Sequence, residues 1–191
     1  IVRQDPDIIL VREIRDEETA EIAVNASLTG HLLLSTFHSN DASTTIPRML
    51  DMKIEPFLLS STLELIIAQR LVRKICDQCK HSFSLKKEDI LARNPKLENC
   101  FYDDEYLLYE GKGCDACGGS GYSGRIAIFE IIQNTPEMQD LILKNPSSRM
   151  IYTLAREQGT KSMFEDGVEK VKNGLTTLDE LMRIVEPPKI N

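Results

Sequence analysis

The stretch that decides the fold is DPDIILVREIRDEETAEIAV, residues 5–24. Its short, continuous apolar run, Ile8 to Val11, predicts a parallel strand that is covered on both faces. Asp16 stands where a helix N-cap is expected, and the two glutamates after it suit the positive end of a helix dipole. We therefore expect a helix that runs to about Leu28 and ends near Gly30.

The same alternation of strands and helices continues along the chain. Residues 32–34 form a second buried apolar run, and helices are expected over 41–52 and after Pro56. A β-branched and aromatic stretch over 125–132 predicts a further strand. The remaining helices are expected to begin near four cap or periodicity signals, at Thr135, Ser147, Phe164 and the capping box Thr177–Glu180. Short links between alternating elements imply a three-layer α/β core.

Residues 73–124 differ in character, because they hold all five cysteines and a cluster of glycines. A C-x-x-C turn places two sulfurs on one tetrahedral zinc ion, and two such pairs supply four thiolates. Thirty-four residues separate the pairs, so they must meet through the fold. The following glycines would let backbone N–H groups approach the sulfurs. The predicted structural zinc ligands are Cys76, Cys79, Cys114 and Cys117, with Cys100 left over. Disulfides, a redox C-x-x-C and an iron–sulfur cluster are the alternatives.

Composition excludes some classes of protein. The net charge is −7, from 23 basic and 30 acidic residues, which argues against a general nucleic-acid binder. No apolar run approaches the roughly 20 residues that span a bilayer. The sequence lacks a signal-peptide layout and a starting Met, so we interpret it as a piece of a longer chain.

Two further groups of residues suggest chemistry. Glu13 follows the first apolar run, at the position where nucleotide-hydrolysing folds hold Mg²⁺ or polarise water. An acidic helix N-terminus is the alternative for this segment. His31 and His38 flank the second run, near opposite ends of the expected strand, so they need not share a ligand. They could simply be hydrogen-bonding histidines in turns. Beside Glu13, however, His38 becomes a sensor of bound phosphate.

Taken together, these segments resemble the ATPases of type II secretion and type IV pilus assembly. Residues 5–42 are similar to that family's Walker B region and histidine box. The segment that leads into the family's tetracysteine insert resembles residues 47–76, PRMLDMKIEPFLLSSTLELIIAQRLVRKIC. The segment at the end of the insert resembles residues 114–132, CDACGGSGYSGRIAIFEII. Residues 159–185 resemble its C-terminal helices.

The resemblance implies a fold and a set of site residues. The fold is α/β, part of a RecA-like three-layer nucleotide-binding core, with a tetracysteine zinc insert and C-terminal helices. The implied domains are 1–72 for the core, 73–124 for the insert and 125–191 for a strand and helices. Glu13 matches the Walker B glutamate, His38 the histidine on the γ-phosphate side, and His31 a second nucleotide-binding position. The four paired cysteines match the zinc ligands.

The implied function is that of a motor. Such ATPases form cytoplasmic homohexameric rings that dock on an inner-membrane platform protein, and ATP turnover with Mg²⁺ drives pilin or pseudopilin assembly. Contact with the membrane is through partners, and no nucleic acid is involved. Retraction motors lack the insert, which favours an extension or secretion motor. The alternative is a zinc-stabilised, non-enzymatic interaction module, because residues 114–121 match one unit of the cysteine-rich chaperones; those chaperones repeat the unit.

Two departures from the family stand out. No G-x-x-x-x-G-K-[ST] phosphate loop occurs in the sequence. We therefore expect that loop upstream of Ile1, and we expect these residues alone to be inactive. Arg12 stands where the family usually has glycine. Strand alternation would turn it away from Glu13, whereas a strand that ends at Val11 would let the two side chains pair.

Overall fold

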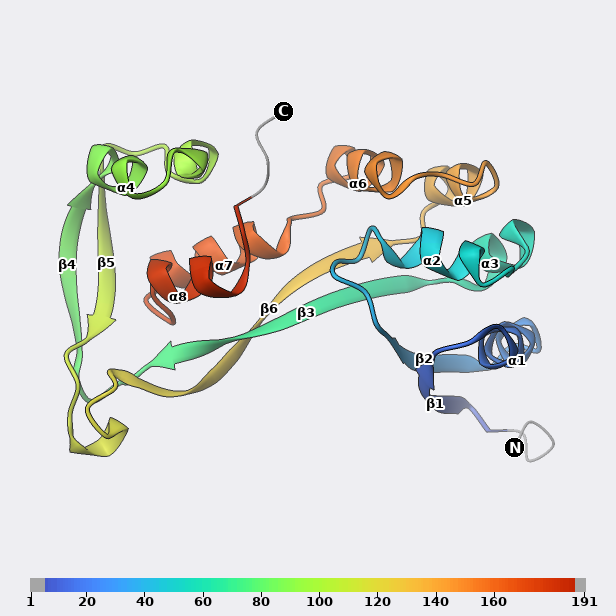
Figure 1. Cartoon of the computed structure of the whole chain (residues 1–191), viewed down its shortest axis with the longest axis horizontal. Coiled ribbons are helices and arrows are strands. Elements are labelled where there is room, and N and C mark those ends of the chain that lie inside the picture. Colours follow the sequence, from blue (N-terminus) through green and yellow to red (C-terminus); the bar gives the residue numbers. More distant parts are fainter. Residues whose placement is uncertain (1–5, 188–191) are drawn as a thin grey trace. The chain divides into compact units, whose positions relative to one another are not determined.

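The computed structural model describes residues 6–187, and the chain forms two compact units. Unit 1 comprises Ile1–Ala68 and Ile131–Thr160, and unit 2 comprises Gln69–Glu130 and Lys161–Asn191. Two long strands, β3 (Leu65–Ile75) and β6 (Tyr122–Gln133), pair with each other (Figure 1). A boundary between the units falls within each strand. The sequence patterns predicted most of β6 but did not predict β3.

Unit 1 begins with the expected strand–helix–strand. β1 (Ile8–Ile14) pairs in parallel with β2 (Leu32–Phe37), and α1 (Glu17–Leu28) connects them. Asp16 caps α1, since its carboxylate accepts the Thr19 N–H at 2.8 Å. Gly30 takes φ +88°, a conformation that favours glycine and reverses the chain after the helix. The predicted strands and the helix between them are confirmed.

The expectation that both faces of this strand pair are covered is wrong for the described chain. Side chains alternate between the faces of a strand. Ile9 is buried, whereas Leu10 on the opposite face is 78% exposed. The same face of β2 leaves Leu32 and Leu34 half exposed.

Four more helices complete unit 1: α2 (Thr45–Asp51), α3 (Pro56–Thr62), α5 (Pro136–Ile142) and α6 (Ser148–Glu157). They contribute the buried side chains Ile46, Leu59, Met138, Ile142 and Ile151 to one core with α1.

The expected start of α2 at Asp41 is wrong. The Asp41 carboxylate accepts the Thr44 N–H at 2.8 Å and the Ser43 hydroxyl at 2.9 Å. Such local side-chain bonds compete with helix formation, so α2 begins only at Thr45.

Unit 2 contains an antiparallel hairpin of β4 (Lys80–Lys86) and β5 (Glu105–Gly111). The connection between these strands holds α4 (Lys87–Arg93) and η2 (Pro95–Cys100), at the end of the hairpin in Figure 1. The short turn η3 (Asp115–Cys117) precedes β6. The expected C-terminal helices are α7 (Met163–Lys172) and α8 (Leu178–Ile184). Within residues 6–187, no helix is both long and apolar enough to cross a membrane.

Candidate functional site

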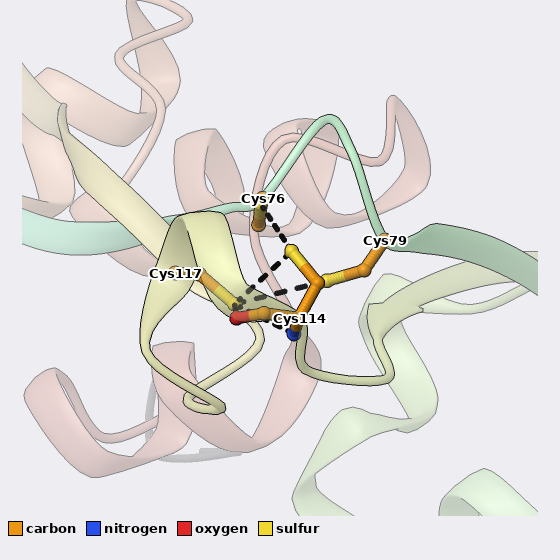
Figure 2. A group of neighbouring side chains, drawn as sticks. All are labelled: Cys76, Cys79, Cys114 and Cys117. Carbon is orange, nitrogen blue, oxygen red and sulfur yellow. Dashed lines mark hydrogen bonds between the residues drawn. The ribbon is translucent and has the colours of Figure 1, made fainter.

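The four paired cysteines meet in unit 2, as Figure 2 shows, with their sulfurs converging from two loops. One loop follows β3 and the other contains η3. All four Sγ atoms lie within 4.8 Å of one another. The Sγ–Sγ distances are 3.9 Å for Cys76–Cys114, 3.9 Å for Cys79–Cys117 and 3.7 Å for Cys114–Cys117.

These distances fit a single metal ion. A tetrahedron with metal–sulfur bonds of about 2.3 Å has sulfurs about 3.8 Å apart. A disulfide would need about 2.05 Å, and the cysteines are free thiols in the structure. The cluster can therefore hold one tetrahedral metal ion. Cys100 is buried outside this group.

Backbone bonds hold the two cysteine loops together. The Cys76 N–H donates to the Gly121 carbonyl at 2.9 Å, and the Gly121 N–H lies 3.3 Å from the Cys117 sulfur. Gly111 approaches so closely that a Cβ there would lie 2.1 Å from the Gly121 oxygen. Gly121 also takes φ +75°. Glycine is thus required where the loops touch, and the expected approach of a backbone N–H to a sulfur is observed.

Two thiols of the cluster have pKa values that are shifted in opposite directions. Burial raises the pKa of the Cys79 thiol to about 12. The backbone N–H of Cys114 lowers the pKa of Cys117 to about 6. Four thiolates cannot share so small a space at neutral pH without positive charge, and a divalent ion supplies it.

A second cluster lies at the carboxyl ends of β1 and β2. Because parallel strands end at the same edge of their sheet, Glu13 near the end of β1 meets His38 just after β2. Arg15 Nη2 lies 2.5 Å from Glu13 Oε2, and His38 Nε2 lies 2.5 Å from Oε1. Oε1 is buried, and it has no hydrogen-bond partner among the described residues.

The charge state of Glu13 follows from these neighbours. The hydrogen bond from Arg15 is the main cause that lowers the pKa of Glu13 below its ordinary value, and His38 acts in the same direction. The Glu13 side chain is 15% exposed. The site therefore presents an ionised carboxylate that lies between Arg15 and His38.

The loop after β2 holds His38 in place through its backbone. The Arg48 guanidinium, from α2, donates to the His38 carbonyl and lies 5.3 Å from the centroid of the Phe37 ring. The Ser39 hydroxyl contacts the Thr45 hydroxyl at 2.8 Å. The imidazole itself remains 80% exposed.

His31 lies elsewhere. It precedes β2, and its Nδ1 is 2.8 Å from the Thr29 hydroxyl. The structure therefore brings Glu13 and His38 together and leaves His31 at the opposite end of β2, as the spacing predicted. No ion pair joins Arg12 to Glu13 among residues 6–187, and Arg12 is exposed.

Sequence reasoning missed Arg15 and Arg48 as members of this cluster. Arg15 is two residues after Glu13, which is the spacing of side chains on one face of a strand, and that spacing could have identified it. No local pattern identifies Arg48, since it reaches the loop from a separate helix.

Comparisons with known proteins identify the family of the chain. Residues 1–183 match the family model described as type II/IV secretion system protein. The type IV pilus assembly ATPase PilB of Thermus thermophilus is 44% identical over 181 residues, which is 95% of this chain and 20% of that protein. The type II secretion system ATPase E of Vibrio cholerae is 43% identical over 97% of this chain and 36% of its own length.

A solved structure shares the fold. The pilus retraction motor PilT with bound ADP superposes with a TM-score of 0.64 at 27% identity, over 97% of this chain and 41% of that one. The predicted fold class, part of a RecA-like α/β core with a tetracysteine cluster, is confirmed. The chain spans between a fifth and two fifths of the length of these proteins. It belongs to the family of type II/IV secretion system proteins.

Proposed function

We propose that this chain is the C-terminal part of a hexameric motor ATPase that couples ATP hydrolysis to pilin or pseudopilin assembly. The motor would serve type IV pilus extension or type II protein secretion. The observation that carries the proposal is the meeting of Glu13, Arg15 and His38 at the carboxyl edge of β1 and β2. The names of the two similar ATPases support it, since one assembles type IV pili and the other serves type II secretion.

Each residue of the cluster has a role in this proposal. Bound Mg²⁺–ATP would supply the transferable phosphoryl group, cradled by a phosphate loop outside these 191 residues. Glu13 offers an ionised carboxylate that orients a water molecule and accepts its proton. Arg15 keeps that carboxylate ionised, and the exposed His38 imidazole faces the γ-phosphate side. His31 is proposed as a more distant nucleotide-binding residue.

The tetracysteine cluster is proposed to bind zinc. Four thiolates at tetrahedral spacing suit Zn²⁺ and leave no open position for a substrate. The ion would then stabilise residues 73–124 and take no part in bond breaking. We propose 1–72 as the core part and 125–191 as the strand and helices that follow the insert.

The remaining parts of the proposal follow from the family resemblance. The motor is proposed to be a cytoplasmic homohexamer, held at the inner membrane through a platform protein, with membrane contact only through such partners.

The proposal is tested by Glu13→Gln in a full-length protein that carries this chain and a phosphate loop. We expect ATP binding to persist and turnover to fall by ~100-fold or more, since a general base typically contributes that much. The matched control is Glu17→Gln, which removes an exposed carboxylate four residues away that pairs with Lys53. It should leave turnover unchanged.

Other results would contradict the proposal. Turnover that survives Glu13→Gln would remove Glu13 from the chemistry. Failure of the full-length protein to bind ATP would favour the zinc-stabilised interaction module instead. The 191-residue chain alone should show no turnover, because no oriented backbone loop and lysine hold the phosphates.

A further inference from the structure

The segment that leads into α8 contacts the strand end that carries the first metal ligand. The Ile75 N–H donates to the Leu175 carbonyl at 2.9 Å. The Thr176 hydroxyl donates to the Arg73 carbonyl at 2.8 Å. Cys76 follows directly, so the backbone just before this ligand is fixed by residues about a hundred positions later in the chain.

The same segment also holds the second cysteine loop. The Tyr122 hydroxyl lies 2.8 Å from the hydroxyl of Thr177, the N-cap of α8. Tyr122 directly follows Gly121, whose N–H contacts the Cys117 sulfur and whose carbonyl accepts the Cys76 N–H. Both ligand loops are thus connected to the start of α8.

One buried carboxylate binds the strand end before Cys76 to the first turn of α8. Glu180, in the first turn of α8, is 1% exposed. Its Oε1 accepts the Arg73 backbone N–H at 3.0 Å, and its Oε2 accepts the Arg73 guanidinium at 2.7 and 3.0 Å. Arg183 binds the same carboxylate at 2.7 and 2.8 Å. The Arg73 guanidinium in turn lies 4.1 Å from the centroid of the Tyr122 ring.

This use of Glu180 differs from the capping box that the sequence predicted. The Thr177 hydroxyl accepts the Glu180 N–H, as in a capping box. The Glu180 carboxylate, however, binds two arginines. A buried carboxylate is stable only when its oxygens are bonded and its charge is paired, and removing the charge leaves the cations without a partner. The arrangement therefore ties α8 to the strand end that precedes Cys76.

We propose that Glu180 is a positioning residue of the metal centre, which acts through Arg73 and Tyr122 on the two cysteine loops. It does not contact the sulfurs. Residues that orient metal ligands from outside the coordination shell typically change metal affinity by ~10–100-fold. The inference rests on the proposed zinc site and adds that α8 determines how firmly the metal is held.

The test uses the zinc-loaded 191-residue chain and the rate at which a chromophoric chelator removes zinc. Glu180→Gln keeps the size of the side chain and removes its charge, and we expect zinc release at least ~10-fold faster. The control, Asp179→Asn, removes a carboxylate from the same turn, where it is 73% exposed. It should release zinc within about twofold of wild type, since an exposed ion pair contributes little. Glu180→Asp, which keeps the charge, should restore part of the slow release.

Cobalt substitution separates positioning from simple packing. The Co²⁺–thiolate absorption spectrum reports the ligand geometry, and we expect Glu180→Gln to change its intensity or band positions while Asp179→Asn does not. If Glu180→Gln fails to fold, Tyr122→Phe removes one hydroxyl and no charge. We then expect release about 5-fold faster, the effect of one lost hydrogen bond.

Three outcomes would overturn the inference. Wild-type release rates in Glu180→Gln, or in Tyr122→Phe where that variant replaces it, would show that the link does not reach the metal. If Glu180→Gln lowers the melting temperature but leaves the cobalt spectrum and the zinc release rate unchanged, Glu180 contributes only to packing and does not position the ligands. If the wild-type chain binds no zinc, the metal assignment fails first, and the inference fails with it.

Discussion

Two arginines flank Glu13 in the sequence, and they have different roles in the structure. Arg15 pairs with the carboxylate at 2.5 Å, whereas Arg12 forms no ion pair with it among residues 6–187 and contributes only a weaker effect of its charge. The departure of Arg12 from the family's glycine had left two arrangements open, an ion pair with Glu13 or a side chain that faces away from it. The chain instead places the guanidinium of the residue after the strand beside the carboxylate, because β1 continues to Ile14.

The first prediction follows from this difference. The pKa of Glu13 is lowered in the folded protein, chiefly by Arg15. The ionised form therefore adds stability above the pKa of the unfolded chain, and this stability is lost as the pH falls through the lower folded pKa. Arg15→Gln should raise the Glu13 titration midpoint in ¹³C NMR of labelled carboxyl groups. The control, Arg12→Gln, should raise it less, and equal shifts would contradict the assignment.

The second prediction concerns single cysteines. Cys79→Ser should abolish tight zinc binding, because three thiolates and a hydroxyl do not make a closed structural site. Cys100→Ser should leave one zinc per chain, since Cys100 lies outside the cluster. Elemental analysis of the purified proteins checks both. Wild-type protein that contains iron or no metal would exclude the zinc assignment.

At the scale of elements, α7 and α8 pack closely because a glycine of α7 faces a leucine of α8. A Cβ on Gly167 would lie 2.2 Å from Leu181 Cδ1, and Leu181 is fully buried. Its side chain therefore cannot move away without disturbing neighbours. Helix propensity alone would favour alanine over glycine by ~0.5–1 kcal/mol.

The third prediction is that Gly167→Ala nevertheless destabilises unit 2. Overpacking a filled core costs ~1–3 kcal/mol, which exceeds the gain in propensity. Urea denaturation should show a lower midpoint for the variant, with an unchanged m-value. Adding Leu181→Val should recover part of the loss by making room for the methyl group. A Gly167→Ala chain that is as stable as wild type would show that Leu181 can repack freely.

Local signals predicted several elements well, and their failures have physical causes. Asp16 and Thr135 cap α1 and α5 as expected, because an N-cap bond depends on residues three positions apart. β3 was missed because a mixed polar and apolar stretch becomes a strand only when it pairs with β6, about sixty residues later. The capping box of α8 is half formed, since the Glu180 carboxylate binds the distant Arg73 instead.

At the scale of the whole molecule, the sequence predicted a contact between distant residues where the chemistry of a shared site requires that contact. Four cysteines in two pairs must converge to bind one ion, so their meeting could be predicted without knowing the path of the chain. The hydrogen bonds that hold the cysteine loops in place could not be predicted in this way. Glu180 is 107 residues from Arg73, and no local pattern connects the two. The meeting of Glu13 and His38 could be predicted in part, because parallel strands place their carboxyl ends at the same edge of a sheet.

The fourth prediction concerns how the chain responds to loss of the metal. Binding of a structural metal contributes directly to folding free energy, and the cysteine loops belong to unit 2. The main core cluster, in contrast, consists of side chains of unit 1 alone. After chelation, amide hydrogen exchange should accelerate in residues 73–124 and in α8. It should remain at the wild-type rate in α1, α5 and α6.

Mass spectrometry of peptides after exchange resolves these segments, and the Cys100→Ser chain, which is expected to keep its metal, serves as the control before chelation. Equal acceleration in both units would mean that the chain unfolds as one cooperative body, against its division into two units. Acceleration limited to the cysteine loops would separate α8 from the metal centre and would contradict the role given to Glu180. Acceleration that includes α8 but spares α1 requires that the metal stabilise helices far away in the sequence, through the hydrogen bonds that connect residues 73–76 and 121–122 to residues 175–180.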